Sequence, residues 1–276
     1  MMTDAADAPS PSAPSPSPST ARPAQPKLRP VNAAHINAAW RAGVKDFTRA
    51  PLMGLFFGGF YAAGGVAMLA AAALYNMGWV VYPALAGFAL IGPFAAVGLY
   101  EISRRLEAGE KPTWGEVLTV IWAQRKREIA WMGFAMLFLL VVWMYQVRML
   151  LALFLGFEAF HGFDGLVQTI FTTPSGIAFL VVGHAIGAVL ALIVFSLTVI
   201  SIPLLLDRDV DFVTAMITSV KTVKDNPGPM FAWGLFVVIA LFIASIPAFL
   251  GLLIALPMLG HATWHIYRHA VEPEAA

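Results

Sequence analysis

The chain has 276 residues, of which 59% are hydrophobic and only 12% are charged, and its mean hydropathy is +0.75. A soluble domain carries roughly 25% charged residues and could not hide this much apolar surface in one core, so an ordinary water-soluble protein is excluded. The 17 basic residues nearly balance the 16 acidic ones, which excludes a basic nucleic-acid-binding domain, and the lack of cysteine excludes disulfides and thiolate metal sites. We therefore expect an all-α, polytopic membrane protein.

The N-terminal tail, residues 1–30, is rich in proline, serine and alanine and holds eight of the nineteen prolines. Such a composition cannot bury enough apolar surface to offset the entropy of ordering it, so we expect a disordered cytoplasmic spacer. A docking site for a proline-recognising partner is the alternative. Residues 31–271 then form a single membrane domain, and residues 272–276 form a second short tail.

Several apolar segments reach the roughly 20 residues that a helix needs to cross a bilayer. Four of them are Leu52–Tyr75, Trp79–Tyr100, Ile129–Leu155 and Pro174–Leu206. The last follows a cap residue, Thr173, and is too long for an untilted crossing, so it must tilt, bend or project.

The apolar stretch Met230–Tyr267 is nearly twice the length of one span. Ser245-Ile246-Pro247 and Gly251 lie near its middle and predict a turn between two helices. This gives six spans in total. A kinked or re-entrant arrangement of this stretch is the alternative.

The basic residues support an even number of spans. Sixteen of the seventeen lie near the termini or in residues 101–128 and 207–229, which six spans place on one side. The loop on the other side, residues 156–172, holds Glu158, His161 and Asp164 but no lysine or arginine. By the positive-inside rule, both termini are expected in the cytoplasm.

Three cytoplasmic segments are predicted to form amphipathic helices, one before each odd-numbered span. Their apolar residues at helical spacing are Ile36, Trp40, Val44 and Phe47; Trp114, Val117, Leu118 and Ile121; and Phe212, Met216, Val220 and Val223. Asp211 is expected to cap the third of these helices, and Thr113 with Glu116 to open the second. The even-numbered spans share a proline near their cytoplasmic ends: Pro93, Pro203 and Pro257. We infer an internal repeat of three hairpins, each preceded by an interfacial helix, over residues 31–101, 112–206 and 210–269.

The cytoplasmic ends of the even-numbered spans carry the densest polar set. The candidate residues are Glu101, Arg104, Asp207, Arg208, His261, His265 and Arg268. If the three units are arranged pseudo-symmetrically, these side chains converge on a cytoplasmic vestibule. Their opposite charges favour salt bridges between units, and a binding site for an anionic headgroup or a small solute is the alternative.

Three polar residues lie inside the predicted spans: Gln146, Arg148 and His184. Arg148 is near the outer boundary, where an arginine reaches the headgroups, and Glu158 and Asp164 are available as partners. His184 lies between Gly183 and Gly187, a pattern that predicts close helix packing and a hydrogen bond to a neighbouring helix. A haem or copper ligand is the sharper alternative.

His261, His265 and His269 share one face of the last helix, but one helix alone cannot close a metal site. His184 and His261 lie at different depths, which argues against a haem held between them. No nucleotide-binding or hydrolase motif is present. We therefore expect no catalytic residue, no metal and no cofactor.

Several longer motifs carry a family resemblance. They are Trp40-Arg41 with Gly43, Asp46 and Pro51; Gly92-Pro93 and Gly98-Leu99-Tyr100-Glu101 with Arg104-Arg105; Leu204-Leu205-Leu206-Asp207-Arg208-Asp209-Val210-Asp211; Asn226-Pro227-Gly228-Pro229; and Gly260-His261-Ala262-Thr263-Trp264-His265 with Tyr267-Arg268. With these motifs, residues 35–271 resemble an uncharacterised family of bacterial integral membrane proteins, a domain of unknown function. The resemblance implies a location in the bacterial inner membrane and supplies no established activity. Some relatives are labelled as a cytochrome c oxidase subunit.

Taken together, these features favour a non-enzymatic inner-membrane protein that acts by binding. It is expected to serve as an accessory or assembly factor for a membrane protein complex, or as a scaffold that interacts with the lipid bilayer. The first alternative is a small-solute transporter or channel, which the repeats and the vestibule charges suggest. The second is a haem or copper subunit associated with a respiratory oxidase.

Overall fold

The computed structural model describes residues 26–75, 95–124, 128–156 and 169–273, and these are helical apart from short connections. The helical segments long and apolar enough to cross a bilayer are Pro51–Ala71, Glu128–Leu155, Pro174–Asp207 and Pro227–Ser245. The prediction of an all-α membrane protein with several apolar helices is confirmed. The expected second span, Trp79–Tyr100, lies mostly outside the described residues, as do most of the tail and the loop with Glu158, so six crossings stay a prediction.

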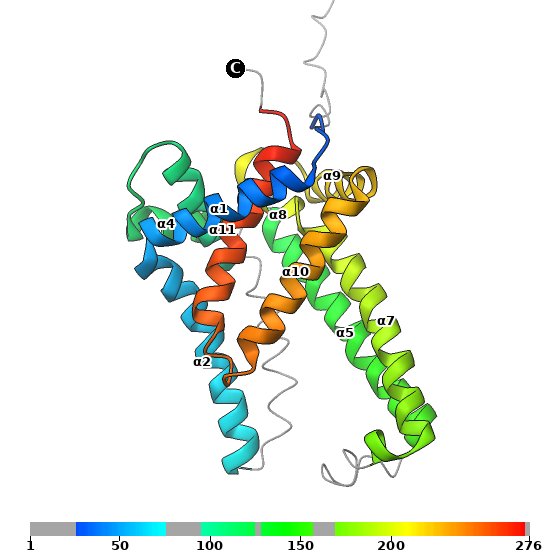
Figure 1. Ribbon diagram of the computed structural model, residues 1–276. Helices are drawn as coiled ribbons and strands as arrows, with labels where there is room; N and C mark the ends of the chain where they lie inside the picture. The colour runs from blue at the N-terminus through cyan, green and yellow to red at the C-terminus, as the bar shows by residue number, and fades with distance from the viewer. Residues whose placement is uncertain (1–25, 76–94, 125–127, 157–168, 274–276) are drawn as a thin grey trace, which may run out of the picture.

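The helices form two layers (Figure 1). The long helices that run away from one end of the molecule are α2 (Pro51–Tyr75), α5 (Glu128–Leu155), α7 (Pro174–Thr198) and α10 (Pro227–Ser245). Across that end lie α1 (Ala33–Arg49), α4 (Trp114–Gln124) and α9 (Phe212–Asp225), which occupy the three segments predicted for interfacial helices. We call this end the interfacial end.

The two ends of the described chain meet at the interfacial end. Leu28 and Val271 form an antiparallel bridge, and the N–H of Arg29 donates to the carbonyl of Ala270 at 2.8 Å. A chain that returns to the side from which it started crosses the membrane an even number of times. The structure therefore supports the even count derived from the basic residues.

The joint between α1 and α2 has the same backbone geometry as the joint between α9 and α10. A single residue breaks the helix in each case, with φ −132° and ψ 54° at Ala50 and φ −129° and ψ 55° at Asn226. A proline, Pro51 or Pro227, then begins the next helix. The residue before a proline is sterically kept out of the α-helical region, and proline itself is well suited to the first helical turn. The sequence therefore bends the chain between α1 and α2 and between α9 and α10.

The predicted helix caps at Asp211 and Thr173 are confirmed. The carboxylate of Asp211 accepts from the N–H of Thr214 at 2.9 Å, and the hydroxyl of Thr173 accepts from the N–H of Gly176 at 3.0 Å. Each side chain satisfies a donor that the first helical turn leaves unpaired.

The fourth predicted span is bent near its interfacial end. α7 stops at Thr198, and a short helix, α8 (Ser201–Asp207), continues after Ile200. Pro203 has no N–H for the carbonyl of Val199, and its ring crowds that carbonyl, so an unbroken helix is disfavoured here. At the same break, the N–H of Ile200 donates a hydrogen bond to the hydroxyl of Ser219 on α9 at 3.1 Å.

The predicted turn in the last apolar stretch is also confirmed. α10 ends at Ser245, residues 246–251 form the turn, and α11 (Leu252–Ala270) returns to the interfacial end (Figure 1). α11 contacts both α1 and α2 extensively and contributes fully buried side chains to the core, among them Trp264 and Ile266.

Glycines allow α11 to approach its neighbours at backbone distance. A Cβ atom on Gly43 of α1 would lie 2.5 Å from the backbone nitrogen of Ala262, and one on Gly58 of α2 would lie 2.6 Å from the carbonyl oxygen of Leu253. Pro257 lacks the N–H that would normally bind the Leu253 carbonyl, so this bare carbonyl faces Gly58. Only glycine leaves room for such a contact.

The apolar residues predicted for α9 divide between two faces of the helix. Phe212, Met216 and Val223 pack partly against the core, whereas Val220 points outwards and is 40% exposed. Val213 and Ile217, which the prediction left out, point outwards with Val220 and are 45% and 54% exposed. The buried face of this helix consists of the small residues Ala215, Thr218, Ser219 and Thr222. Close packing against α7 and α8 selects small side chains, and helical spacing alone does not reveal that selection.

The neighbouring glycines Gly58 and Gly59 provide a matched test of this packing. We expect Gly58→Ala to destabilise the protein by about 1–3 kcal/mol, because the new methyl group collides with backbone that cannot move aside. Gly59→Ala should be nearly neutral, since its Cβ would meet only the Leu253 side chain, at an ordinary 3.5 Å. Thermal unfolding in detergent, followed by the fluorescence of the eight tryptophans, measures both. Equal midpoints for the two variants would contradict the close contact.

Candidate functional site

The predicted vestibule residues lie at the interfacial end, on helix 95–107, on α11, and at or just after the end of α8. The structure engages them in ion pairs and hydrogen bonds, many of which connect different helices. We call this set and its direct partners the polar layer. It divides into a glutamate centre, a cross-helix ion pair and two histidine pairs.

Glu101 is the centre of the polar layer on helix 95–107, and its side chain is completely buried. Its carboxylate accepts from Nε of Arg104 at 2.7 Å and from Nε of Arg105 at 2.6 Å. Arg105 also reaches Glu116 of α4 at 3.0 Å, which ties the start of that helix to helix 95–107. The hydrogen bond that Arg104 donates to Glu101 raises the pKa of Arg104, so the guanidinium stays charged at every physiological pH.

The cross-helix ion pair joins α11 to both α8 and helix 95–107. Arg268 lies 3.2 Å from Glu107 and 3.5 Å from Asp207. The hydroxyl of Tyr267 donates to Asp207 at 2.6 Å, and Nε1 of Trp264 donates to Glu107 at 3.1 Å. Side chains from one face of α11, the sixth predicted span, therefore hold helix 95–107 and α8, which are the interfacial ends of the second and fourth predicted spans.

The two vestibule histidines point to separate partners. Nδ1 of His261 lies 2.8 Å from the hydroxyl of Ser103, and the ring is completely buried. Nε2 of His265 lies 2.7 Å from the carboxylate of Asp46, which itself is only 5% exposed on α1. The remaining vestibule residue, Arg208, donates to the backbone carbonyl of Glu272. The structure thus brings Asp207 and Arg268 together, whereas Arg208, His261 and His265 bind elsewhere.

His269, one turn beyond His265, stacks on His35 of α1. The two ring centroids are 5.0 Å apart and the ring planes differ by 13°. Burial, followed by the nearby charges of His35, His265 and Arg29, lowers the pKa of His269 below its ordinary 6.5. His269 therefore favours its neutral form in this stack.

The polar layer links the helix ends. In the described part of the chain, no group of three or more histidine or acidic side chains is arranged to hold a metal ion. Two buried nitrogens, Nε2 of His261 and Nε of Arg208, have no hydrogen-bond partner among the described residues. Apart from Glu101 and Arg104, which pair within helix 95–107, and Arg208, which binds a backbone carbonyl, the groups described above bind side chains of neighbouring helices, so the arrangement stabilises the junction.

The sequence pattern did not identify Ser103 and Glu107 as partners. Both lie on helix 95–107, Ser103 two residues after Glu101 and Glu107 one turn after Arg104, but nothing in their spacing signals a contact with α11. Asp46 was noted only as part of a family motif. Its position four residues before the helix break at Ala50 gives no sign that it meets His265, which is 219 residues away.

The polar residues inside the predicted spans have different surroundings. Gln146 is half-buried and Arg148 is exposed, both on α5. The predicted hydrogen bond from His184 to a neighbouring helix is wrong: its ring is exposed, and Nδ1 binds the carbonyl of Leu180 in the same helix at 2.7 Å. A histidine on a lipid-facing surface can satisfy one nitrogen on its own backbone, and close packing is not required. Of the two flanking glycines, Gly187 does pack against Trp143 of α5, while Gly183 has open space beside it.

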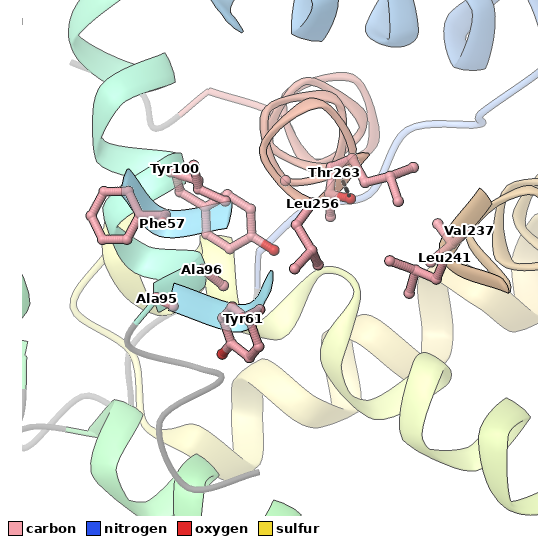
Figure 2. A pocket seen from close by; sticks show the side chains of 12 residues that line it. Phe57, Tyr61, Ala95, Ala96, Tyr100, Val237, Leu241, Leu256 and Thr263 are labelled. Carbon is pink, nitrogen blue, oxygen red and sulfur yellow. Dashed lines mark hydrogen bonds between the residues drawn. The ribbon is translucent and has the colours of Figure 1, made fainter. Parts of the chain in front are cut away.

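Below the polar layer lies an apolar cavity of about 300 Å³ between α2, helix 95–107, α10 and α11. Figure 2 shows Phe57, Tyr61 and Tyr100 on one side and Val237 and Leu241 of α10 on the other. Among the residues that the structure describes, the lining is aromatic and aliphatic, with hydroxyls only from the tyrosines and Thr263.

One comparison with known families gives a match. Residues 81–207 match the model of a family described as predicted integral membrane protein (DUF2189). This confirms, for that segment, the resemblance to an uncharacterised family of integral membrane proteins. The segment includes Glu101, Arg104 and Asp207, whereas the motifs around Trp40, Asn226 and His261 lie outside it. Searches of curated proteins and of solved structures found no match.

The buried position of Glu101 predicts a strong effect of neutralising it. Glu101→Gln should destabilise the protein by about 3 kcal/mol, because Arg104 and Arg105 lose their shared carboxylate. Glu110→Gln is the matched control: Glu110 also approaches Arg105, at 3.4 Å, but its side chain is 59% exposed, so the loss should stay below about 1 kcal/mol. The midpoints of thermal unfolding in detergent measure the loss of stability in each variant. An equal shift of the midpoint in the two variants would contradict the buried position of Glu101.

The stacked histidines predict a pH dependence of stability. As the pH falls through 6.5, the unfolded chain binds a proton on His269 more readily than the folded protein does, so the fold loses stability. We expect His269→Asn to flatten the decrease in thermal midpoint on acidification. His184→Asn, which alters a histidine bound to its own helix, should leave the slope unchanged. An unchanged slope in His269→Asn would show that this pair does not control the effect.

Proposed function

We propose that this integral membrane protein is a non-enzymatic scaffold that binds anionic lipid headgroups at its interfacial end. In this proposal the interfacial end faces the cytoplasm of a bacterium and the protein resides in the inner membrane. The distribution of basic residues supports the orientation, since sixteen of seventeen fall at the termini or in segments assigned to that side.

The outward face of α9 is the observation that carries the proposal. Val213, Ile217 and Val220 follow one another at helical spacing and are at least 40% exposed. An apolar row on the outside of a helix, with small polar residues on the inside, suits a helix whose surroundings are lipid. Lys221 and Lys224 are exposed at the end of the same row, where they can meet a negatively charged headgroup.

The other two interfacial helices offer similar surfaces. On α4, Trp114, Leu118 and Trp122 are exposed at four-residue intervals, and tryptophan is favoured at the level of the headgroups. On α1, the exposed residues Arg41, Lys45 and Arg49 form a basic stripe with the same spacing. Together the three helices form a collar of apolar, aromatic and basic side chains.

Aromatic pairs attach the collar to the membrane helices. Trp40 of α1 meets Phe236 of α10 with ring centroids 5.0 Å apart, and Trp114 of α4 meets Phe56 of α2 at 5.3 Å. Phe212 of α9 stacks on Trp131 of α5 at 6.3 Å. Such pairs stabilise by about 0.5–1.5 kcal/mol beyond the area that they bury. They support a collar that is held rigidly.

The same pairs support the three-unit repeat that we propose for the fold. Each joins an interfacial helix to the first long helix of the preceding unit: the second unit to the first, the third to the second, and the first to the third. A cyclic order of this kind is the expected result of three related units arranged around an axis. The matching backbone geometry at Ala50 and Asn226 agrees with it.

The alternatives gain less support from the described residues. The cavity in Figure 2 has a lining suited to a hydrocarbon chain, so it does not favour transport of a small polar solute. A haem or copper subunit would need His184 to face another ligand, but this ring is bound to its own helix. A role as an assembly factor remains compatible with the collar, which would then hold a protein partner.

Lipid binding by α9 is testable with a charge-matched pair of variants. We expect the wild-type protein in mixed micelles to retain phosphatidylglycerol in preference to phosphatidylethanolamine, measured by native mass spectrometry. Lys221→Gln with Lys224→Gln should weaken phosphatidylglycerol binding about fivefold per lysine, corresponding to about 1 kcal/mol each.

The control is Lys27→Gln with Lys111→Gln, which removes the same charge from exposed positions outside the three collar helices. It should leave the preference unchanged. An equal loss in both double variants, or no preference in the wild-type protein, would contradict the proposal. A protein partner recovered in stoichiometric amount without bound lipid would favour the assembly factor.

A further inference from the structure

The turn between α10 and α11 has the composition of a segment surrounded by lipid. No aspartate, glutamate, lysine or arginine occurs between Asp225 and Arg268. Ile246 and Leu250 in the turn are 69% and 53% exposed, and Ile243 just before it is 58% exposed. A turn that reached the water beyond the membrane would be expected to carry polar side chains at these exposed positions.

The turn lies well before the far end of α2. The ring of Phe249 packs on Gly65, where an added Cβ would come within 2.5 Å of it. Beyond Gly65, α2 continues for ten apolar or aromatic residues to Tyr75, which is about 15 Å of helix. Figure 1 shows the same relation: the turn ends part of the way along α2, and α10 reaches it obliquely. Half of a 30 Å hydrocarbon layer is about this distance.

Most backbone donors of the turn are paired within it. The N–H groups of Ile246, Ala248, Phe249, Leu250 and Leu252 donate to carbonyls within residues 243–249, at 2.9–3.2 Å. Pro247 has no N–H to satisfy, and the hydroxyl of Ser245 binds the carbonyl of Leu241 at 2.8 Å. This internal pairing matters most where no water is available, because an unpaired backbone group in hydrocarbon is costly.

From these observations we infer that α10 and α11 form a re-entrant hairpin whose turn contacts lipid acyl chains near the middle of the bilayer. The described crossings are then α2, α5 and α7 with α8, and the span that the sequence predicts over residues 79–100 brings the expected number to four. The termini stay on one side, as the bridge between Leu28 and Val271 requires.

Two residues of the turn show how the hairpin is held at that depth. Ala248 and Phe249 adopt φ values of 50° and 65°, in the left-handed region that residues with a side chain rarely occupy. This backbone directs the Phe249 ring onto Gly65. The contact compensates for the unfavourable conformation and anchors the turn against α2.

The absence of native cysteine allows a direct test in the full chain. Single variants Ile246→Cys, Ala248→Cys and Leu250→Cys are exposed to a membrane-impermeant maleimide, in intact spheroplasts and in inside-out vesicles. Ser175→Cys, at the far end of α7, and Lys224→Cys, on α9, are the controls for the two faces, since both positions are exposed. We expect each control to react from one face only.

The three turn cysteines should remain unlabelled from both faces and react fully once the protein is dissolved in sodium dodecyl sulfate. Labelling of any of them from the Ser175 face at the rate of the control would show a complete crossing and overturn the inference. Labelling from the Lys224 face would also overturn it, because it would place the turn in water. Three positions are used so that the result does not depend on the folding of one variant.

Discussion

The close contact of α11 with the glycines of α1 and α2 is the constraint on which the rest of the structure depends. Inside a membrane the hydrophobic effect does not draw helices together, because lipid is as apolar as the side chains, so tight packing of backbones takes its place. Gly43 and Gly58 permit this approach from two sides. With α11 held in this way, Trp264, Tyr267 and Arg268 reach helix 95–107 and α8, and His265 reaches α1. One helix therefore positions most of the polar layer.

The features that local sequence predicts are those that depend on a few neighbouring residues. Pro51, Pro203 and Pro227 mark breaks because proline lacks an N–H and restricts the residue before it. Thr173 and Asp211 cap their helices because their oxygens reach donors three residues ahead. The interfacial helices and the turn after Ser245 follow from the same kind of signal, and all lie where the sequence indicates.

The pairing within the site could not be predicted because it depends on contacts between residues far apart in the chain. Glu107 and Trp264 are 157 residues apart, and neither position carries a local signal for the other. The position of the charged groups at one end could be predicted, since burying a charge in lipid is costly, but the choice of partner is made by helix packing. His184 shows the converse: the glycines around it suggest a contact, yet its polar atom needs only the carbonyl one turn away.

The packing of α1 on α11 also has a consequence for biogenesis. Gly43 emerges from the ribosome early, whereas Ala262 follows 219 residues later. At 5–20 residues per second, this delay is roughly ten to forty seconds. During that time the first helix lacks α11, with which it makes most of its contacts, so its inward surface must rest on the bilayer or be shielded by the insertion machinery. A polypeptide that stops before its last helix would keep this surface open, which gives quality-control proteases a feature by which to recognise incomplete chains.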